Sequence, residues 1–112
     1  MTTDEKVELA RQLAERLRIK RSEWRRWVNY FSQCGDLEKA LKLAEYLARS
    51  PAVRSEPQKA NKQIRSVLSE RIGNLRNLPF NALVEIFGYV GWWLVWLQES
   101  GTETSRTKPQ RK

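Results

Sequence analysis

Apolar residues recur every three or four positions along most of the chain, which is the spacing of one buried helix face. The first such face runs from Val7 to Leu17 and includes Ala10, Leu13 and Ala14. Thr2 and Glu5 precede it with the spacing of a capping box. The pattern therefore predicts a helix near the N-terminus.

Two further helices are predicted on either side of Gly35. The second begins near Ser22 and ends at Gly35, because glycine readily adopts the left-handed conformation that closes a helix. Asp36 is then a favourable N-cap for the third helix. The predicted core residues are Trp24, Trp27, Val28 and Phe31 on the second helix, and Leu37, Ala40, Leu41, Ala44, Leu47 and Ala48 on the third.

The segment Ser50 to Gln58 contains two prolines and is predicted to be the longest internal loop. A fourth helix follows, and Gly73 and Asn74 end it. Pro79 suits the first turn of a fifth helix that reaches about Glu99. The apolar side of the fourth helix consists of Ala60, Ile64, Val67, Leu68 and Ile72.

The fifth helix is unusual because apolar residues occupy all of its faces. Between Leu78 and Leu97 only Asn81 and Glu85 are strongly polar. A helix of this kind is typical of the centre of a bundle or of a protein interface, and we expect the segment 80–97 at the centre. The alternative is a tail-anchored membrane span over 78–97, because about 20 residues of helix cross a bilayer core.

The pattern as a whole predicts an all-α fold, a compact bundle of about five helices with an apolar, Trp-rich last helix. We expect one domain over residues 1–100. Residues 102–112 contain no apolar side chain, so we expect 101–112 to form a disordered, basic tail.

Positive charge is concentrated in particular segments. The chain has 21 Lys and Arg against 13 Asp and Glu, a net charge of +8. Residues 11–26 and residues 49–76 each carry seven basic and two acidic side chains, or +5. The tail 101–112 adds four basic and one acidic side chain, or +3. Such blocks are typical of a surface that binds polyanions.

Within the two internal blocks, basic residues that fall off the apolar stripes are candidates for contacts with a phosphate backbone. The other interpretation is an ordinary solvated face with local acidic partners. Arg11 and Arg18 lie seven residues apart and are expected side by side on the first helix. Tyr30 lies off the core stripe and is the aromatic ring most expected at the surface. The candidate nucleic-acid-binding residues are Arg11, Arg18, Arg21, Arg25, Arg26, Lys59, Lys62 and Arg65.

The residues that most enzymes need are missing from the sequence. Without histidine the chain lacks the commonest general base and metal ligand. Cys34 is the only cysteine, so neither a disulfide nor a zinc site is expected. Gly88 and Gly91 are interpreted as points of close helix approach. We therefore expect a protein that is not an enzyme and that uses no metal and no cofactor.

Two segments resemble the small subunits of type III CRISPR effector complexes. The first is Gly35 to Leu41 leading into Ala44 to Leu47, and the second runs from Ala82 through Trp93 to Leu97. Together they cover about a third of the chain. The resemblance implies a non-catalytic, all-helical subunit for antiviral defence, which stacks along a ribonucleoprotein and holds the RNA or the target strand through basic residues.

These observations favour a cytoplasmic structural subunit of a ribonucleoprotein that binds RNA or single-stranded nucleic acid. The apolar last helix is expected to contact other protein subunits. Two alternatives stay open: an adaptor or regulator that binds an acidic protein, and a tail-anchored membrane protein.

Overall fold

The computed structural model describes the backbone of residues 1–107 and the side chains of residues 1–98. The described chain is all helical, without a strand. Its helices are α1 (Thr3–Arg16), α2 (Arg21–Cys34), α3 (Leu37–Arg49), α4 (Ser55–Glu70), α5 (Ile72–Leu75) and α6 (Phe80–Thr107). The predicted all-α fold is confirmed, with the short α5 as an addition.

The predicted helix ends around α1, α2 and α3 are confirmed in atomic detail. The Thr2 hydroxyl accepts from the Glu5 amide, and the Glu5 carboxylate accepts from the Thr2 amide. Gly35 closes α2 with φ of 68°. The Asp36 carboxylate accepts from two amides in the first turn of α3. Polar side chains thus satisfy backbone donors that a helix start leaves without partners.

The region between α3 and α6 differs from the prediction. The loop after Ser50 is shorter than expected, because α4 begins at Ser55 and includes Pro57 in its first turn. A proline is tolerated there since the first amides of a helix have no acceptor within it. The segment after Glu70, predicted as a break, forms the single turn α5, in which Leu75 is buried.

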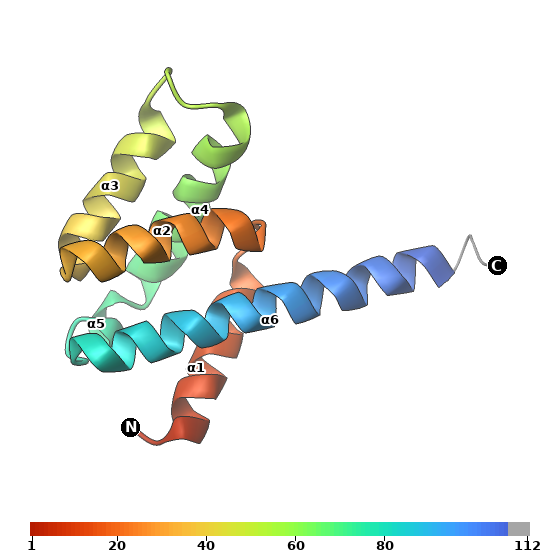
Figure 1. The fold of residues 1–112 in the computed structure, drawn as a ribbon, viewed down its shortest axis with the longest axis horizontal. Coiled ribbons are helices and arrows are strands. Elements are labelled where there is room, and N and C mark those ends of the chain that lie inside the picture. Colours follow the sequence, from red (N-terminus) through yellow and green to blue (C-terminus); the bar gives the residue numbers. More distant parts are fainter. Residues whose placement is uncertain (108–112) are drawn as a thin grey trace.

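Helix α2 lies between two helix pairs (Figure 1). On one side α6 packs against α1, and on the other α3 packs against α4 in a hairpin. Helix α2 contacts α3, α4 and α6. The centre of the bundle is therefore α2, and the expectation that the last helix would occupy it is wrong.

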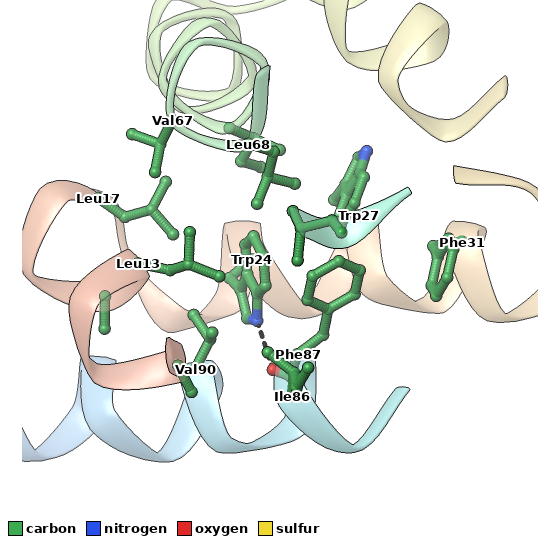
Figure 2. Close-up of a cluster of buried hydrophobic side chains, with 14 of the residues drawn as sticks. Leu13, Leu17, Trp24, Trp27, Phe31, Val67, Leu68, Ile86, Phe87 and Val90 are labelled. Carbon is green, nitrogen blue, oxygen red and sulfur yellow. Dashed lines mark hydrogen bonds between the residues drawn. The ribbon is translucent and has the colours of Figure 1, made fainter. Parts of the chain in front are cut away.

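Aromatic side chains of α2 form the middle of the core (Figure 2). Trp24, Trp27 and Phe31 are buried, as predicted, and all three rings meet Phe87 of α6. Both indole N–H groups have acceptors: Trp24 donates to the carbonyl of Phe87 at 2.9 Å, and Trp27 to that of Ala40 at 2.8 Å. The two indoles thus connect α2 to α6 and to α3.

Helix α6 buries one side and exposes the other. Ile86, Phe87 and Val90 are fully buried, whereas Trp92 is 59% exposed and Trp96 is 51% exposed. Two of the tryptophans predicted as core or interface residues therefore lie at the surface of the isolated chain.

The two glycines of α6 differ in their surroundings. A β-carbon on Gly91 would lie 3.5 Å from the Trp24 ring, so Gly91 faces α2, but the space there would also hold an ordinary β-carbon. At Gly88 the same atom would meet open space, so the prediction is wrong at that position.

The backbone of α6 is helical to Thr107, beyond Gly101, where the sequence suggested the end of the domain (Figure 1). The rest of the predicted disordered tail, residues 108–112, lies outside the described residues.

Candidate nucleic-acid interface

The linker between α1 and α2 brings the two internal basic blocks together. Three contacts join it to α4: Arg16 pairs with Glu70 at 2.6 Å, the Arg18 amide donates to the Gln63 side chain at 3.2 Å, and Lys20 pairs with Glu56 at 3.0 Å.

Between those contacts the linker turns its apolar side chains inward. Leu17 and Ile19 are buried, and Arg18 between them is exposed. We call this region, residues 16–20 with the facing side of α4 from Glu56 to Glu70, the linker–α4 junction. It is the structural link between residues 11–26 and residues 49–76.

Five of the eight predicted residues are exposed and have no ion pair among the described side chains. Arg18 and Lys59 belong to the junction itself. Lys62 lies one turn further along α4, and Arg21 and Arg25 lie on the first turns of α2. They point outward because the buried positions of each helix, such as Trp24 and Ile64, are on the opposite side. We call Arg18, Arg21, Arg25, Lys59 and Lys62 the free cations.

Arg11 does not belong with them. Its guanidinium lies between Glu8 and Glu15 and pairs with both. Hydrogen bonds from Arg11 hold the pKa of Glu8 below its usual range, and Glu8 in turn raises the pKa of Arg11. Helix α1 also ends at Arg16, so Arg18 is in the linker and not beside Arg11 on one helix as predicted.

Arg26 and Arg65 are also paired with carboxylates. Arg26 lies 3.7 Å from Glu23 on its own helix, and Arg65 lies 3.3 Å from Glu45 across the α3–α4 contact. The Arg65 partner comes from another helix, which the local sequence does not reveal. Both residues have part of their charge compensated and are weaker candidates than the free cations.

Two residues of the junction were not among the predicted set. Lys20 lies beside Arg18 and is paired with Glu56. Gln63 fixes the backbone of Arg18, although it looks like an ordinary polar position of α4. No local signal identifies Gln63, since its partner is 45 residues away. Arg54, just before α4, is a further exposed cation without an ion pair in the described part of the chain.

The aromatic residues near the cations separate as the helical spacing predicted. Tyr30 is exposed, while its neighbours Trp27 and Phe31 are in the core.

Cys34 is partly buried and its thiol donates to the carbonyl of Asp36 at 3.3 Å. Within residues 1–98 no three His, Cys, Asp or Glu side chains are grouped in a way that would hold a metal ion.

One helix in the described chain has the length and composition to cross a membrane, Phe80–Gln98, with a mean hydropathy of 1.3. The same helix supplies Ile86, Phe87 and Val90 to the core. A spanning orientation would remove these side chains from their packing with α1 and α2, so the fold favours a helix that stays in the bundle.

Comparison with protein-family models, with curated proteins and with solved structures finds no match to this chain. The resemblance to type III CRISPR small subunits therefore stays a hypothesis drawn from two segments of the sequence.

Proposed function

We propose that this protein is a non-catalytic structural subunit of a ribonucleoprotein that binds the backbone of RNA or of single-stranded DNA. The observation that carries the proposal is the linker–α4 junction, where the two basic blocks meet and the free cations point to solvent. Their charge is available to a polyanion because no described carboxylate pairs with them.

Phosphate contacts explain both the strength and the lack of sequence specificity expected of this surface. Each phosphate that a lysine or arginine neutralises releases a condensed counterion, which favours binding for any sequence. The free cations lie on helix exteriors and a linker, and within residues 1–98 they are not gathered on one helix as they would be on a recognition helix. Binding is therefore expected to depend on salt and hardly on base identity.

The resemblance to type III CRISPR small subunits supports a more specific form of the proposal. In that form the protein is a cytoplasmic subunit of an RNA-guided antiviral effector complex and holds the guide RNA or the target strand. The exposed half of α6 then contacts other protein subunits, since Trp92 and Trp96 leave a large apolar surface that an isolated soluble chain rarely keeps.

The proposal is tested by replacing the five free cations with glutamine. The variant is expected to lose most of its affinity for single-stranded RNA while keeping its helical circular dichroism, because exposed substitutions change stability by less than about 0.5 kcal/mol each. Deletion of residues 102–112, which removes four basic side chains, is the control and is expected to weaken binding less. Loss of binding in the deletion alone would contradict the proposed surface.

Two measurements on the wild-type protein separate the adaptor hypothesis from this one. An adaptor for an acidic protein would use the same cations, but purified protein would then carry no nucleic acid and would bind polyglutamate better than RNA. We expect the purified protein to show the ultraviolet absorbance of bound nucleic acid, removable with high salt.

A double substitution, Trp92→Glu with Trp96→Glu, tests the role of α6. Both side chains are more than half exposed, so the variant is expected to fold and to keep its RNA affinity. In cells that contain the native complex it is expected to elute as a free subunit on size exclusion. Wild-type protein that needs detergent for extraction, with a double variant that does not, would instead support the membrane hypothesis.

A further inference from the structure

A cleft of about 900 Å³ opens at the linker–α4 junction. The linker forms one wall and the first turns of α4 form the second. Leu94, Leu97 and Gln98 of α6 form the floor. Gln98 of α6 donates to the carbonyl of Ile19 and so ties that end of α6 to the linker. The cleft thus lies between segments that are each fixed to a neighbour.

The charges that line the cleft are unevenly compensated. Its three carboxylates already have cationic partners: Glu15 pairs with Arg11 at 2.6 Å, Glu56 with Lys20 at 3.0 Å, and Glu23 with Arg26 at 3.7 Å. The remaining two charged groups in the lining, Arg18 and Lys59, are free cations. An anionic group is therefore the ligand that the cleft lacks.

The floor of the cleft has a different chemistry from its rim. Leu97 is half-buried and supplies the exposed aliphatic surface of the floor, while Ile19 and Leu94 in the lining are almost fully covered by the fold. The lining amides belong to Gln63 and Gln98. An anion with a flat, mostly apolar ring and several hydrogen-bonding edges fits this combination better than a bare phosphate does.

We propose that the cleft receives one unpaired nucleotide of the bound strand, with its phosphate between Arg18 and Lys59 and its base against Leu97 on the floor. This inference rests on the proposed nucleic-acid binding and adds to it a preference for single strands over duplexes. The cleft is within the size range of sites for small ligands. A base can enter only when it is unstacked and unpaired, so single strands are bound in preference to duplexes.

Further free cations follow the cleft residues along both helices. Arg21 continues from the linker onto α2, and Lys62 continues from Lys59 along α4. In the proposed binding mode the phosphates of the strand follow these cations past the mouth of the cleft. The nucleotide at that point faces the aliphatic floor and leaves the water.

Two pairs of charge-matched variants test the proposal. Arg18→Gln with Lys59→Gln removes the cations of the cleft, and Arg21→Gln with Arg25→Gln removes two cations outside it. Affinities are measured by fluorescence anisotropy on a labelled single-stranded RNA and on an RNA duplex with the same number of phosphates. The cleft pair is expected to lose about tenfold more affinity on the single strand than on the duplex, because a nucleotide whose phosphate is no longer held leaves the cleft and about one base contact is lost with it. The outer pair is expected to lose similar factors on both.

A second comparison leaves every charge in place. Leu97→Trp enlarges a half-buried side chain of the floor and obstructs the place proposed for the base, while Val95→Trp adds the same ring to a half-buried position of α6 outside the cleft. Leu97→Trp is expected to abolish the preference for single strands and to leave duplex affinity unchanged. Val95→Trp is expected to keep the preference. Free adenosine monophosphate is expected to compete with the single strand in the wild type but not in Leu97→Trp.

Each other outcome overturns a defined part of the account. Equal losses of affinity in all variants, on the single strand and on the duplex, would show that the cations bind phosphates without a nucleotide site. That result would overturn the proposed cleft and leave the proposed function standing. Failure of the wild type to bind either probe would overturn the proposed function itself. Displacement by polyglutamate, with no effect of adenosine monophosphate, would assign the cleft to an acidic protein segment.

Discussion

At the scale of single residues, Trp24 does more than fill space. It is buried between α2 and α6, its ring meets those of Trp27 and Phe87, and its indole N–H donates to the Phe87 carbonyl (Figure 2). Gly91 is buried beside the ring, and a β-carbon there would lie 3.5 Å from it, an ordinary van der Waals contact. Shape and hydrogen bonding therefore act on the same contact between two helices.

Trp24→Phe is expected to lower the free energy of unfolding by about 1–3 kcal/mol, because it removes a buried hydrogen bond and part of the ring volume. Trp92→Phe is the matched control, since Trp92 is largely exposed, and its effect is expected below about 0.5 kcal/mol. Urea denaturation followed by circular dichroism measures both. Equal effects in the two variants would contradict the central position of α2.

The ion pairs of Arg11 predict the titration of a carboxylate. Hydrogen bonds from Arg11 lower the pKa of Glu8, so this group stabilises the fold above the ordinary glutamate pKa and loses that effect as the pH falls through the lowered value. Nuclear magnetic resonance titration of Glu8 is expected to show the lowered pKa, and Arg11→Gln is expected to raise it toward the ordinary value. An unchanged Glu8 pKa in the variant would show that the pair does not persist in solution.

At the scale of helices, a few residues with particular backbone conformations determine where a helix ends. Gly35 has a φ of 68°, which a side chain makes unfavourable. Gly35→Ala is expected to cost about 1 kcal/mol or somewhat more in thermal or urea unfolding. Gly73→Ala, at a glycine with ordinary φ and open space around its α-carbon, is expected to be neutral or slightly stabilising. A reversed order would contradict the described end of α2.

Local signals of this kind explain which helices the sequence could predict. The capping box at Thr2 and the N-cap at Asp36 involve residues that are close in sequence, so both can be recognised from the sequence alone. Pro57 misled the prediction because proline is compatible both with a loop and with a first helical turn. The single turn α5 has too few residues for any periodicity, and its place follows from the burial of Leu75.

The candidate site was less predictable than the helices because it depends on partners that are distant in sequence. Basic composition and helical facing identified the five free cations correctly as exposed positions. They did not show that Arg65 faces Glu45 of another helix, nor that Gln63 fixes the backbone of Arg18. Those contacts arise only when the linker packs on α4.

At the scale of the whole molecule, the order of the helices reverses an expectation from hydropathy. An all-round apolar helix was expected at the centre, but α2 is there because its aromatic side meets both helix pairs (Figure 1). Helix α6 buries only one of its apolar sides in the core, and on the other side Trp92 and Trp96 lie at the surface. Hydropathy measures how apolar a helix is and leaves open whether its own chain or another partner covers it.

The same packing separates two chemistries on the molecule. The junction of the linker with α4 carries free positive charge, whereas the exposed half of α6 carries tryptophan and a single described carboxylate, Glu85, which pairs with Lys6. The proposed polyanion and the proposed apolar protein partner can therefore bind at different places on this small protein. This arrangement fits a component that holds a strand within a larger assembly.

The salt dependence of binding to single-stranded RNA tests the central claim most directly. If the five free cations each contact a phosphate, the logarithm of the affinity should fall with the logarithm of the salt concentration with a slope of about −3.5. The variant with all five replaced by glutamine should show a much shallower slope, left by the tail and the remaining basic side chains, with the fold intact by circular dichroism. Affinity that does not change with salt, or an equal slope in the wild type and the variant, would contradict the account.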